Sequence, residues 1–229
     1  MLASVAIILL LASVADGQHE RRPRCVPMFT GRASAKSDHQ RPGPFILQSC
    51  DYEHFMDWGL AAGIAQLFIA RGTARVDILE LGAGCGCYTD FFSWLGFRMH
   101  AFDGSRNIAN LTNGLVSTAD LSLPQTFPMA EWVVSLEVGE HIPKEQQSVF
   151  LHNLVDHAKR GVVLSWALPH QTDGPAHPNQ LKNGEVIAEM EKLGMRHDAK
   201  GSLQLRENAG HFCCSWFKRT IMVFVKRAR

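Results

Sequence analysis

Acidic and imidazole side chains are concentrated in the sequence Glu-Val-Gly-Glu-His at residues 137–141. Glu137, Glu140 and His141 follow an apolar segment typical of a buried strand, so we expect them at the carboxyl edge of a sheet. Two carboxylates and an imidazole suit Mg²⁺ or Mn²⁺. Histidine is also the side chain best suited to take a proton near neutral pH. Three interpretations stay open: a metal site, a base or orienting role for His141 or Glu140, and a helix cap without chemistry.

A second candidate segment is the sequence Glu-Leu-Gly-Ala-Gly-Cys-Gly at residues 80–86, between a predicted strand and a predicted helix. Glycine tolerates backbone angles and close approaches that a Cβ atom would block. The dinucleotide-binding fingerprint requires a further glycine where this chain has Cys87. Glu80, at the start of the loop, favours a cationic ligand group over a phosphate. The loop therefore predicts a cofactor site that is not built for a pyrophosphate.

Two more carboxylates follow predicted strands. Asp103 lies 21 residues after Gly82, where an acid can accept hydrogen bonds from both hydroxyls of a ribose. Asp120 follows a third short strand, where it can accept a hydrogen bond from an adenine amino group. Each acid taken alone is more often a cap or loop residue. Because Glu80 and these two acids follow three successive strands, we interpret them together as a nucleoside site.

Strands and helices are predicted to alternate from Cys50 onward. Helical spacing of apolar residues predicts a helix that starts at Asp51 and ends at Arg71–Gly72. Most predicted strands are continuous apolar runs, which suits a sheet covered on both faces. The alternation indicates βαβ units and a mostly parallel sheet, which is an α/β fold. The predicted strands are 76–81, 97–102, 116–119, 132–136, 161–166 and 221–225, and the further helices are 89–95, 108–115, 144–158 and 184–193.

Composition excludes several classes of protein. The chain has 229 residues, of which 46% are hydrophobic and 20% are charged. This apolar content excludes a disordered chain, and the length is sufficient for an ordinary core. A formal net charge of +1 gives no global field for nucleic acid or an anionic membrane, so no nucleic-acid partner is predicted.

Taken in order, the motifs resemble those of class I S-adenosylmethionine-dependent methyltransferases. The resemblance rests on Val76–Cys87, Asp103, Asp120–Leu121 and Ser135–Pro143, and it covers roughly residues 50–226. It implies a Rossmann-like three-layer sandwich with a seven-stranded, mostly parallel sheet and an antiparallel last strand. It also implies that S-adenosylmethionine is the cofactor and methyl donor. In such a transfer the protein mainly positions the acceptor in line with the methyl group.

The resemblance also assigns roles to individual residues. The predicted cofactor-binding residues are Glu80, Gly82, Gly84 and Gly86 for the methionine part, Asp103 for the ribose, Asp120 and Leu121 for the adenine, and Glu137. The spacing Glu137-x-x-Glu140-His141 is similar to the metal-binding motif of ubiquinone-pathway O-methyltransferases and small-RNA 2′-O-methyltransferases. It implies a Mg²⁺ or Mn²⁺ ion held by these three residues. His177, in the polar loop after the fifth predicted strand, is a candidate for a further ligand. Many class I methyltransferases carry Glu-His here with no metal, so the other interpretations stay open.

The loop from Trp166 to Asn179 faces the acceptor in this family. Gln171, His177 and Asn179 can form directed hydrogen bonds with a polar substrate, and Trp166 can stack on a ring. The alternative is a surface turn rich in proline and glycine. The predicted catalytic residues are His141, Glu140 and His177.

The N-terminal region differs in character from the rest. Residues 1–17 are largely apolar and end in small residues, which predicts a signal peptide or, alternatively, a signal-anchor. Residues 18–49 are a basic, proline-containing lead-in to a methyltransferase domain at residues 50–229. We therefore expect the secretory lumen or the exterior, or the cytosol if the segment is not functional. A sequon at Asn110 is usable only in the secretory pathway.

The six cysteines are too few for a disulfide scaffold. Cys85 and Cys87 are expected to be free thiols, because a bridge between such near neighbours is strained. A bridge within Cys213–Cys214 would be rare, whereas Cys25 and Cys50 can pair in an oxidising lumen.

The sequence thus predicts an enzyme that methylates an oxygen or nitrogen of a polar acceptor, which is a small molecule, glycan or natural product. One alternative is a luminal or secreted binding protein that keeps the cofactor fold without catalysis. Another is a different nucleotide-using Rossmann enzyme, such as a reductase.

Overall fold

The computed structural model describes residue 50 and residues 56–171, 177–211 and 213–227. The predicted signal segment and basic lead-in lie outside these residues. Within the described part of the chain, no helix is both long and apolar enough to cross a membrane.

The centre of the fold is one seven-stranded sheet. Its strands are β1 Asp77–Leu81, β2 Arg98–Asp103, β3 Ser117–Thr118, β4 Ala130–Ser135, β5 Ala158–Leu164, β6 Met195–His197 and β7 Met222–Lys226. The order across the sheet is β3-β2-β1-β4-β5-β7-β6. Neighbours from β3 to β5 are parallel, and β7 is antiparallel to both β5 and β6. This arrangement confirms the predicted Rossmann-like α/β fold with an antiparallel last strand.

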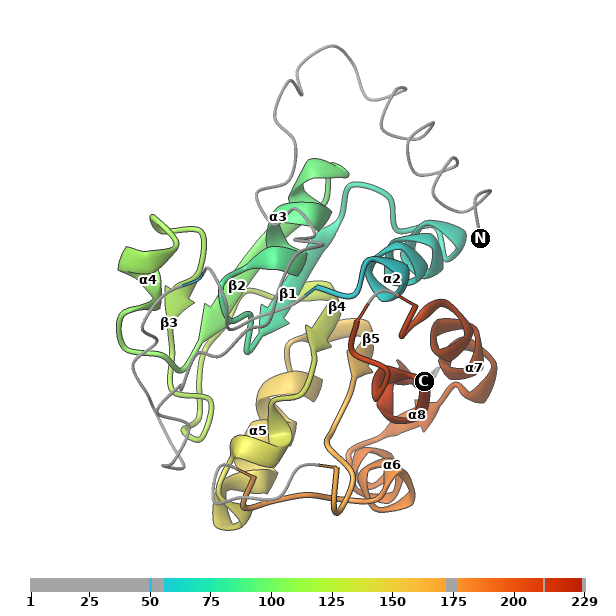
Figure 1. Cartoon of the computed structure of the whole chain (residues 1–229). Helices are drawn as coiled ribbons and strands as arrows, with labels where there is room; N and C mark the ends of the chain where they lie inside the picture. The colour runs from blue at the N-terminus through green and yellow to red at the C-terminus, as the bar shows by residue number, and fades with distance from the viewer. Residues whose placement is uncertain (1–49, 51–55, 172–176, 212, 228–229) are drawn as a thin grey trace.

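Helices cover both faces of the sheet, as Figure 1 shows. They are α2 Trp58–Ala70, α3 Cys87–Trp94, α4 Ile108–Leu111, α5 Gln147–Val155, α6 Asn183–Lys192, α7 Ala199–Asn208 and α8 Phe217–Thr220, with short 3₁₀ turns η1 Gly139–His141 and η2 Lys144–Gln146. One apolar cluster joins the sheet to α2, α3 and α7, and a second joins it to α5 and α6. The three layers follow from these two separate cores.

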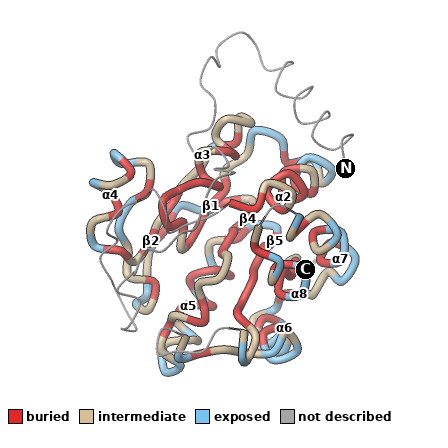
Figure 2. The backbone as a smooth tube through the Cα atoms, in the orientation of Figure 1, coloured by how far each residue is buried: buried red, intermediate tan, exposed pale blue. Residues whose placement is uncertain are grey.

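The sheet is buried along most of its length, whereas the outer sides of α6 and α7 are exposed (Figure 2). Aromatic rings fill the core beneath α2, where the Phe68 ring stacks on Trp132 with centroids 5.1 Å apart. Because helices shield both faces of the sheet from water, the strands have continuous apolar sequences and do not alternate between apolar and polar residues.

Some element boundaries differ from the predictions. Helix α2 begins after Asp57, whose Oδ1 accepts a hydrogen bond from the Leu60 N–H at 2.9 Å. Residues 51–55, where the helix was expected to start, lie outside the described residues. Strand β6 and helix α7 were not predicted, because β6 has only three residues and α7 carries few apolar side chains.

Candidate active site

The glycine loop joins β1 to α3 at the carboxyl edge of the parallel strands. Gly82, Gly84 and Gly86 all have positive φ angles, of 80°, 52° and 75°. A Cβ atom on Gly82 would lie 2.2 Å from Cγ2 of Val138, so a larger residue cannot fit without displacing its neighbour. Backbone conformation thus favours glycine at all three positions, and at Gly82 the lack of space requires it as well.

Asp103, at the end of β2, anchors this loop. Its Oδ2 accepts a hydrogen bond from the Gly84 N–H at 2.8 Å, and its Oδ1 accepts one from the Ser105 N–H at 2.8 Å. A carboxylate has about four acceptor sites, so two remain for a ligand. The side chain is 7% exposed, which limits its contacts to a group that enters the loop.

Glu80 lies at the base of the loop, and its carboxylate accepts a hydrogen bond from the Thr89 hydroxyl. Burial raises the pKa of Glu80 to about 8, and the charge of Asp103 raises it further while the Thr89 bond opposes the shift. A cationic group beside this carboxyl would favour its ionised form. The base of the loop is therefore suited to a positively charged ligand group.

Asp120 is engaged locally. Its Oδ1 accepts hydrogen bonds from the Ser122 N–H at 2.9 Å and the Ser122 hydroxyl at 2.6 Å. Leu121 is buried, and its carbonyl accepts a hydrogen bond from Nδ2 of Asn153 at 3.1 Å. The structure thus holds this predicted adenine-binding turn in a fixed shape after β3.

A disulfide joins Cys50 to Cys85 in the middle of the glycine loop, with the Cα atoms 5.5 Å apart. Cys87 is disulfide-bonded as well. The predictions of free thiols in this loop and of a bridge between Cys25 and Cys50 are therefore wrong. Cys213 and Cys214 form a vicinal disulfide. Spacing along the chain misled these predictions because tertiary folding, not sequence distance, brings Cys50 to the loop.

Two carboxyl groups lie together after β4. Glu137 has a positive φ of 54°, and its Oε2 accepts a hydrogen bond from Nε2 of Gln171 at 2.8 Å while Oε1 accepts one from the Thr220 hydroxyl at 3.2 Å. Glu140 is 1% exposed, and its Oε2 has no hydrogen-bond partner among the described residues. Burial raises the pKa of both groups, and the charge of Glu137 raises that of Glu140 further.

Glu140 also forms a cluster with two histidines. One potential ligand atom from each of Glu140, His141 and His177 lies within 4.8 Å of the others. The two imidazole rings meet edge to face with centroids 4.6 Å apart. Of the four predicted metal ligands, the structure thus brings three into one cluster. Glu137 is outside this cluster, with its carboxylate bonded to Gln171 and Thr220.

Searches with this chain against models of protein families and against curated protein sequences find no match. A search of solved structures finds many matches. Magnesium protoporphyrin IX methyltransferase ChlM from Synechocystis PCC 6803, with bound SAH, is 16% identical with a TM-score of 0.57 over 76% of this chain and 90% of that chain. The CcbJ methyltransferase from Streptomyces caelestis is 13% identical with a TM-score of 0.58 over 84% and 100%. The glycopeptide N-methyltransferase MtfA complexed with sinefungin is 16% identical with a TM-score of 0.54 over 81% and 100%.

This chain has the fold of a class I methyltransferase. In a methyltransferase fold, ligands bind outside the carboxyl ends of the parallel strands. Glu80, Asp103 and Glu137 all lie at that edge, directly at or after the ends of β1, β2 and β4. The predicted acidic residues therefore share one edge with the glycine loop.

In the polar loop after β5, two residues that were predicted to contact a substrate are buried. Trp166 is fully buried, and its indole N–H donates to the carbonyl of Asn179 at 2.6 Å. A Cβ on Gly139 would lie 2.2 Å from the Trp166 ring, so the ring packs directly against η1. Trp166 therefore supports the loop and is not available to stack on a substrate, and buried Asn179 likewise acts within the loop. Residues 172–176 of this loop lie outside the described residues.

Thr220 on α8 was missed by the sequence reasoning. It contacts Glu137 from a position 83 residues further along the chain. No local motif marks such a residue, because only the packing of α8 against the end of β4 gives it a role. The same is true of Thr89, whose contact with Glu80 depends on how α3 follows the loop.

Proposed function

We propose that this chain is an S-adenosylmethionine-dependent methyltransferase that acts on an oxygen or nitrogen of a polar acceptor, a small molecule or glycan. The observation that carries the proposal is the glycine loop, held at its centre by Asp103 and backed by the buried carboxyl of Glu80. The solved structures of similar fold add support, since CalS10 is described as an amino pentose methyltransferase and MtfA as a glycopeptide N-methyltransferase.

The residues at this edge fit such a cofactor. The glycines let the backbone approach a ligand closely, the two remaining acceptor sites of Asp103 suit ribose hydroxyls, and Glu80 suits the positive charge of the methionine part. When bound, S-adenosylmethionine supplies an activated methyl group on a sulfonium. The protein then has to exclude water and align the acceptor atom with that methyl group.

On the acceptor side, His141 and His177 are the groups suited to remove a proton. Their rings are half-buried at the same edge, and an imidazole titrates close to neutral pH. Burial raises the pKa of Glu140, which favours the protonated form that can donate a hydrogen bond. Glu137 is held in place by Gln171 and Thr220. We assign His141 and His177 as the candidate general bases, and Glu140 as the carboxyl group that forms a hydrogen bond with them.

As the alternative to this base role, we propose that Glu140, His141 and His177 hold a divalent cation. The donor atoms are already clustered, and one oxygen of Glu140 lacks a partner in the described part of the chain. Two imidazoles and one carboxylate suit Mn²⁺ or another transition metal better than Mg²⁺, because Mg²⁺ prefers oxygen ligands. Glu140 must lose its proton when the metal binds, so the affinity should rise with pH.

Calorimetric titration of the protein with MnCl₂ tests this site. Wild type should bind one ion and release a proton, and His177→Ala should weaken binding about tenfold or more. His170→Ala serves as the matched control, since His170 is exposed in the same loop. Absence of saturable binding, or equal weakening in both variants, would overturn the metal site.

Titration with S-adenosylhomocysteine tests the main proposal. Wild type should bind, Asp103→Ala should lose most of the affinity, and Asp156→Ala, which removes an exposed carboxylate of another region, should behave like wild type. If wild type does not bind S-adenosylhomocysteine, the proposal fails. Binding of a nicotinamide cofactor instead would support the alternative of a reductase. Binding without methyl transfer to any fraction of a host extract favours the alternative of a non-catalytic binding protein.

We also propose that the protein works in the secretory lumen or outside the cell. The disulfide between Cys50 and Cys85 supports this, because disulfides persist in oxidising compartments. Asn110 of the sequon is exposed on α4. Expression of the full chain in a eukaryotic cell should give a form that shifts in mass on glycosidase treatment, and Asn110→Gln should not shift. Recovery of the chain in the cytosol with reduced thiols would overturn the assignment.

A further inference from the structure

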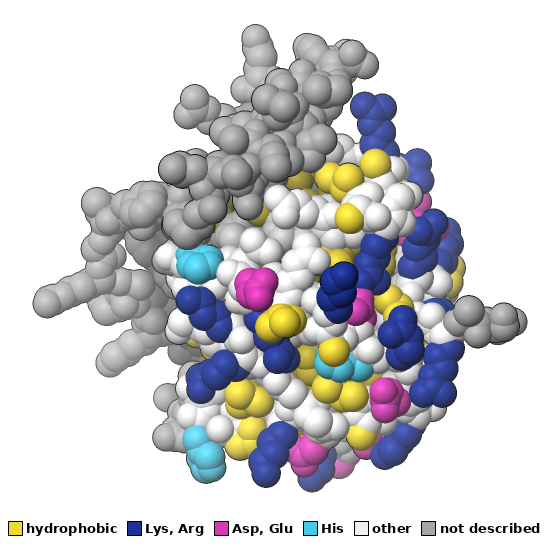
Figure 3. Space-filling model, turned by 90° about the vertical axis from the view of Figure 1, so that its right-hand side faces the viewer, with side chains coloured by type: hydrophobic (Ala, Val, Ile, Leu, Met, Phe, Trp, Pro, Cys, Tyr) yellow, Lys and Arg dark blue, Asp and Glu magenta, His cyan; other side chains and the backbone are white. Residues whose placement is uncertain are grey.

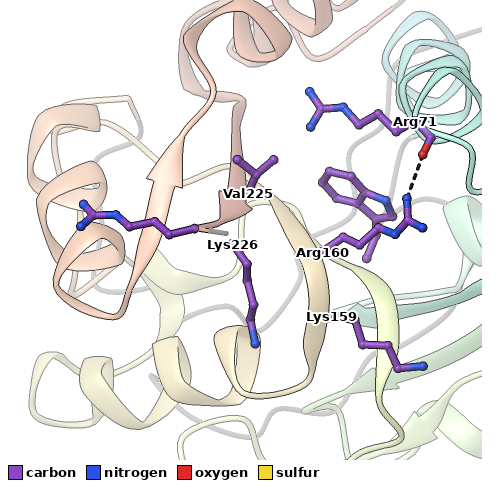
Figure 4. Close-up of a pocket in the computed structure, with 7 residues that line it drawn as sticks. Arg71, Lys159, Arg160, Val225 and Lys226 are labelled. Carbon is purple, nitrogen blue, oxygen red and sulfur yellow. Dashed lines mark hydrogen bonds between the residues drawn. The ribbon is translucent and has the colours of Figure 1, made fainter. Parts of the chain in front are cut away.

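A cationic cavity lies at the edge of the sheet opposite the glycine loop. Its volume is about 380 Å³, and five of the side chains that line it are cationic: Arg71, Lys159, Arg160, Lys226 and Arg227 (Figure 4). They come from the end of α2, the start of β5 and the end of β7. Because β7 is antiparallel, its last residues reach the edge where the parallel strands begin.

The floor of the cavity follows from one glycine in the sheet. Trp132 on β4, Gly161 on β5 and Val225 on β7 are paired in register across three strands. A Cβ on Gly161 would lie 2.4 Å from the Trp132 ring and 2.3 Å from the carbonyl oxygen of Phe224. The Trp132 ring therefore occupies the space over the glycine and is 1% exposed. Val225 is half-buried and is the apolar side chain that faces the cavity.

Two of the arginines are fixed before any ligand arrives. Arg71 forms an ion pair with Asp198, and its guanidinium lies over the Trp132 ring, 5.2 Å from the centroid. Nε of Arg160 donates to Oε2 of Glu131 at 2.8 Å, and its Nη1 donates to the Arg71 carbonyl at 2.9 Å, the bond drawn in Figure 4. Fixed guanidinium groups lose little entropy when they bind an anion.

Positive charge exceeds negative charge in the cavity. Glu131 is shared between Arg160 and Lys159, whose Nζ lies 3.5 Å from its Oε1. In the described part of the chain, neither Lys226 nor Arg227 forms an ion pair. Lys and Arg side chains gather on the side of the molecule that carries α7 (Figure 3). An anion in the cavity would therefore meet cations that lack a counter-charge.

We propose that this cavity binds a phosphate monoester. Its free polar groups are hydrogen-bond donors, which match the acceptor oxygens of phosphate, and arginine forks bind such oxygens in pairs. The doubly charged phosphate group fits the excess of positive charge better than a singly charged sulfate ester. The volume lies within the range of small-molecule sites, so the cavity has room for part of the carrier beside Val225. The site is separate from the cofactor edge and does not depend on the proposed methyl transfer.

Calorimetric titration of the full chain with phenyl phosphate and with phenyl sulfate tests the proposal, because the two ligands differ in charge but share the ring. Wild type should bind phenyl phosphate more tightly. The double variant Lys226→Glu/Arg227→Glu should weaken binding about tenfold or more, since it reverses two charges beside the oxyanion. Both side chains are exposed, so the variant should keep the thermal stability of wild type.

A double variant with the same change in net charge provides the control. Lys144→Glu/Lys182→Glu alters two exposed lysines that precede α5 and α6, and it should change phenyl phosphate affinity by less than about twofold. Three results would overturn the proposal: no saturable binding of phenyl phosphate by wild type, equal weakening in both double variants, or equal affinity for the two esters. The last result would mark a general anion site that does not select for the phosphate charge.

Discussion

Carboxyl groups at the two edges of the sheet are shifted in opposite directions. At the edge with the glycine loop, burial raises the pKa of Glu80 to about 8 and also raises the pKa values of Glu137 and Glu140. At the other edge, hydrogen bonding to Arg98 lowers the pKa of Asp77 to about 2.

The difference shows that one sheet can hold acids in two states. At the glycine-loop edge, Glu80, Glu137 and Glu140 form no ion pair with an arginine of the described residues. Their burial therefore destabilises the apo protein and leaves them ready for a cationic ligand. At the opposite edge Arg98 stabilises the charged form of Asp77, so this acid serves to position a cation. Functional sites commonly show this departure from the most stable arrangement.

The largest expected effect tests the raised pKa of Glu80. The native state holds a proton that the unfolded chain has released between about pH 4.5 and about pH 8. Stability of the apo protein should therefore fall as the pH rises through this window, by at most about 1.4 kcal/mol per pH unit for this group. In Glu80→Gln the loss of stability per pH unit should be smaller, and the part that remains should come from Glu137 and Glu140. Urea unfolding at several pH values measures the free energy of unfolding of both proteins. The same pH dependence in wild type and variant would contradict a raised pKa of Glu80.

The disulfide in the glycine loop should give the next largest effect. It joins residues 35 apart in the sequence, so its removal by Cys50→Ser/Cys85→Ser should cost about 3–4 kcal/mol of stability in the chain-entropy model. The matched control is Cys213→Ser/Cys214→Ser, which opens a bridge between adjacent residues and should cost far less. Urea unfolding without reductant compares the two, and equal losses would show that loop closure is not the cause.

Gly82→Ala tests the space around the loop. The substitution adds backbone strain at a positive φ and a clash with Val138, so it should cost about 2–3 kcal/mol and abolish cofactor binding. Gly72→Ala introduces the same kind of strain at a φ of 72° but meets no atom within 4 Å. It should cost about 1 kcal/mol. Thermal unfolding and S-adenosylhomocysteine titration of both variants separate strain from crowding.

The smallest effect is expected from Asp77→Asn. Asp77 has a lowered pKa, so its ion pair with Arg98 contributes stability above about pH 4 that is lost as the pH falls through about 2. Because the pair is at the surface, the contribution should be about 0.5 kcal/mol or less. Acid unfolding curves of wild type and variant should converge at low pH. If the variant is more stable than wild type at neutral pH, the charged form of Asp77 is not stabilised at this edge of the sheet.

Apolar strands and glycines at their ends made the fold predictable from the sequence. Strand β1 and the loop that follows it have the expected positions, since a buried parallel strand needs a continuous apolar run. The short strand β6 lacks such a run and was not predicted. The acids at the strand ends were found because each follows an apolar strand in the sequence.

The partners of these acids were harder to predict. Thr220 reaches Glu137 through the packing of α8, and Cys50 reaches the loop through tertiary folding. Trp166 was expected to face a substrate because of its residue type, but the absence of a side chain on Gly139 lets it pack inward. Residue type and spacing identify candidates, whereas contacts between distant segments decide their orientation.

The reversed direction of β7 has a practical consequence for anyone who modifies this protein. Since Lys226, the last residue of the strand, lines the cationic cavity, a peptide tag fused directly after Arg227 would be tethered close to that cavity, at the edge of the sheet opposite the glycine loop. An acidic tag such as a polyaspartate would compete for the lysines and arginines there. Ligand screens should therefore use protein from which the tag has been cleaved.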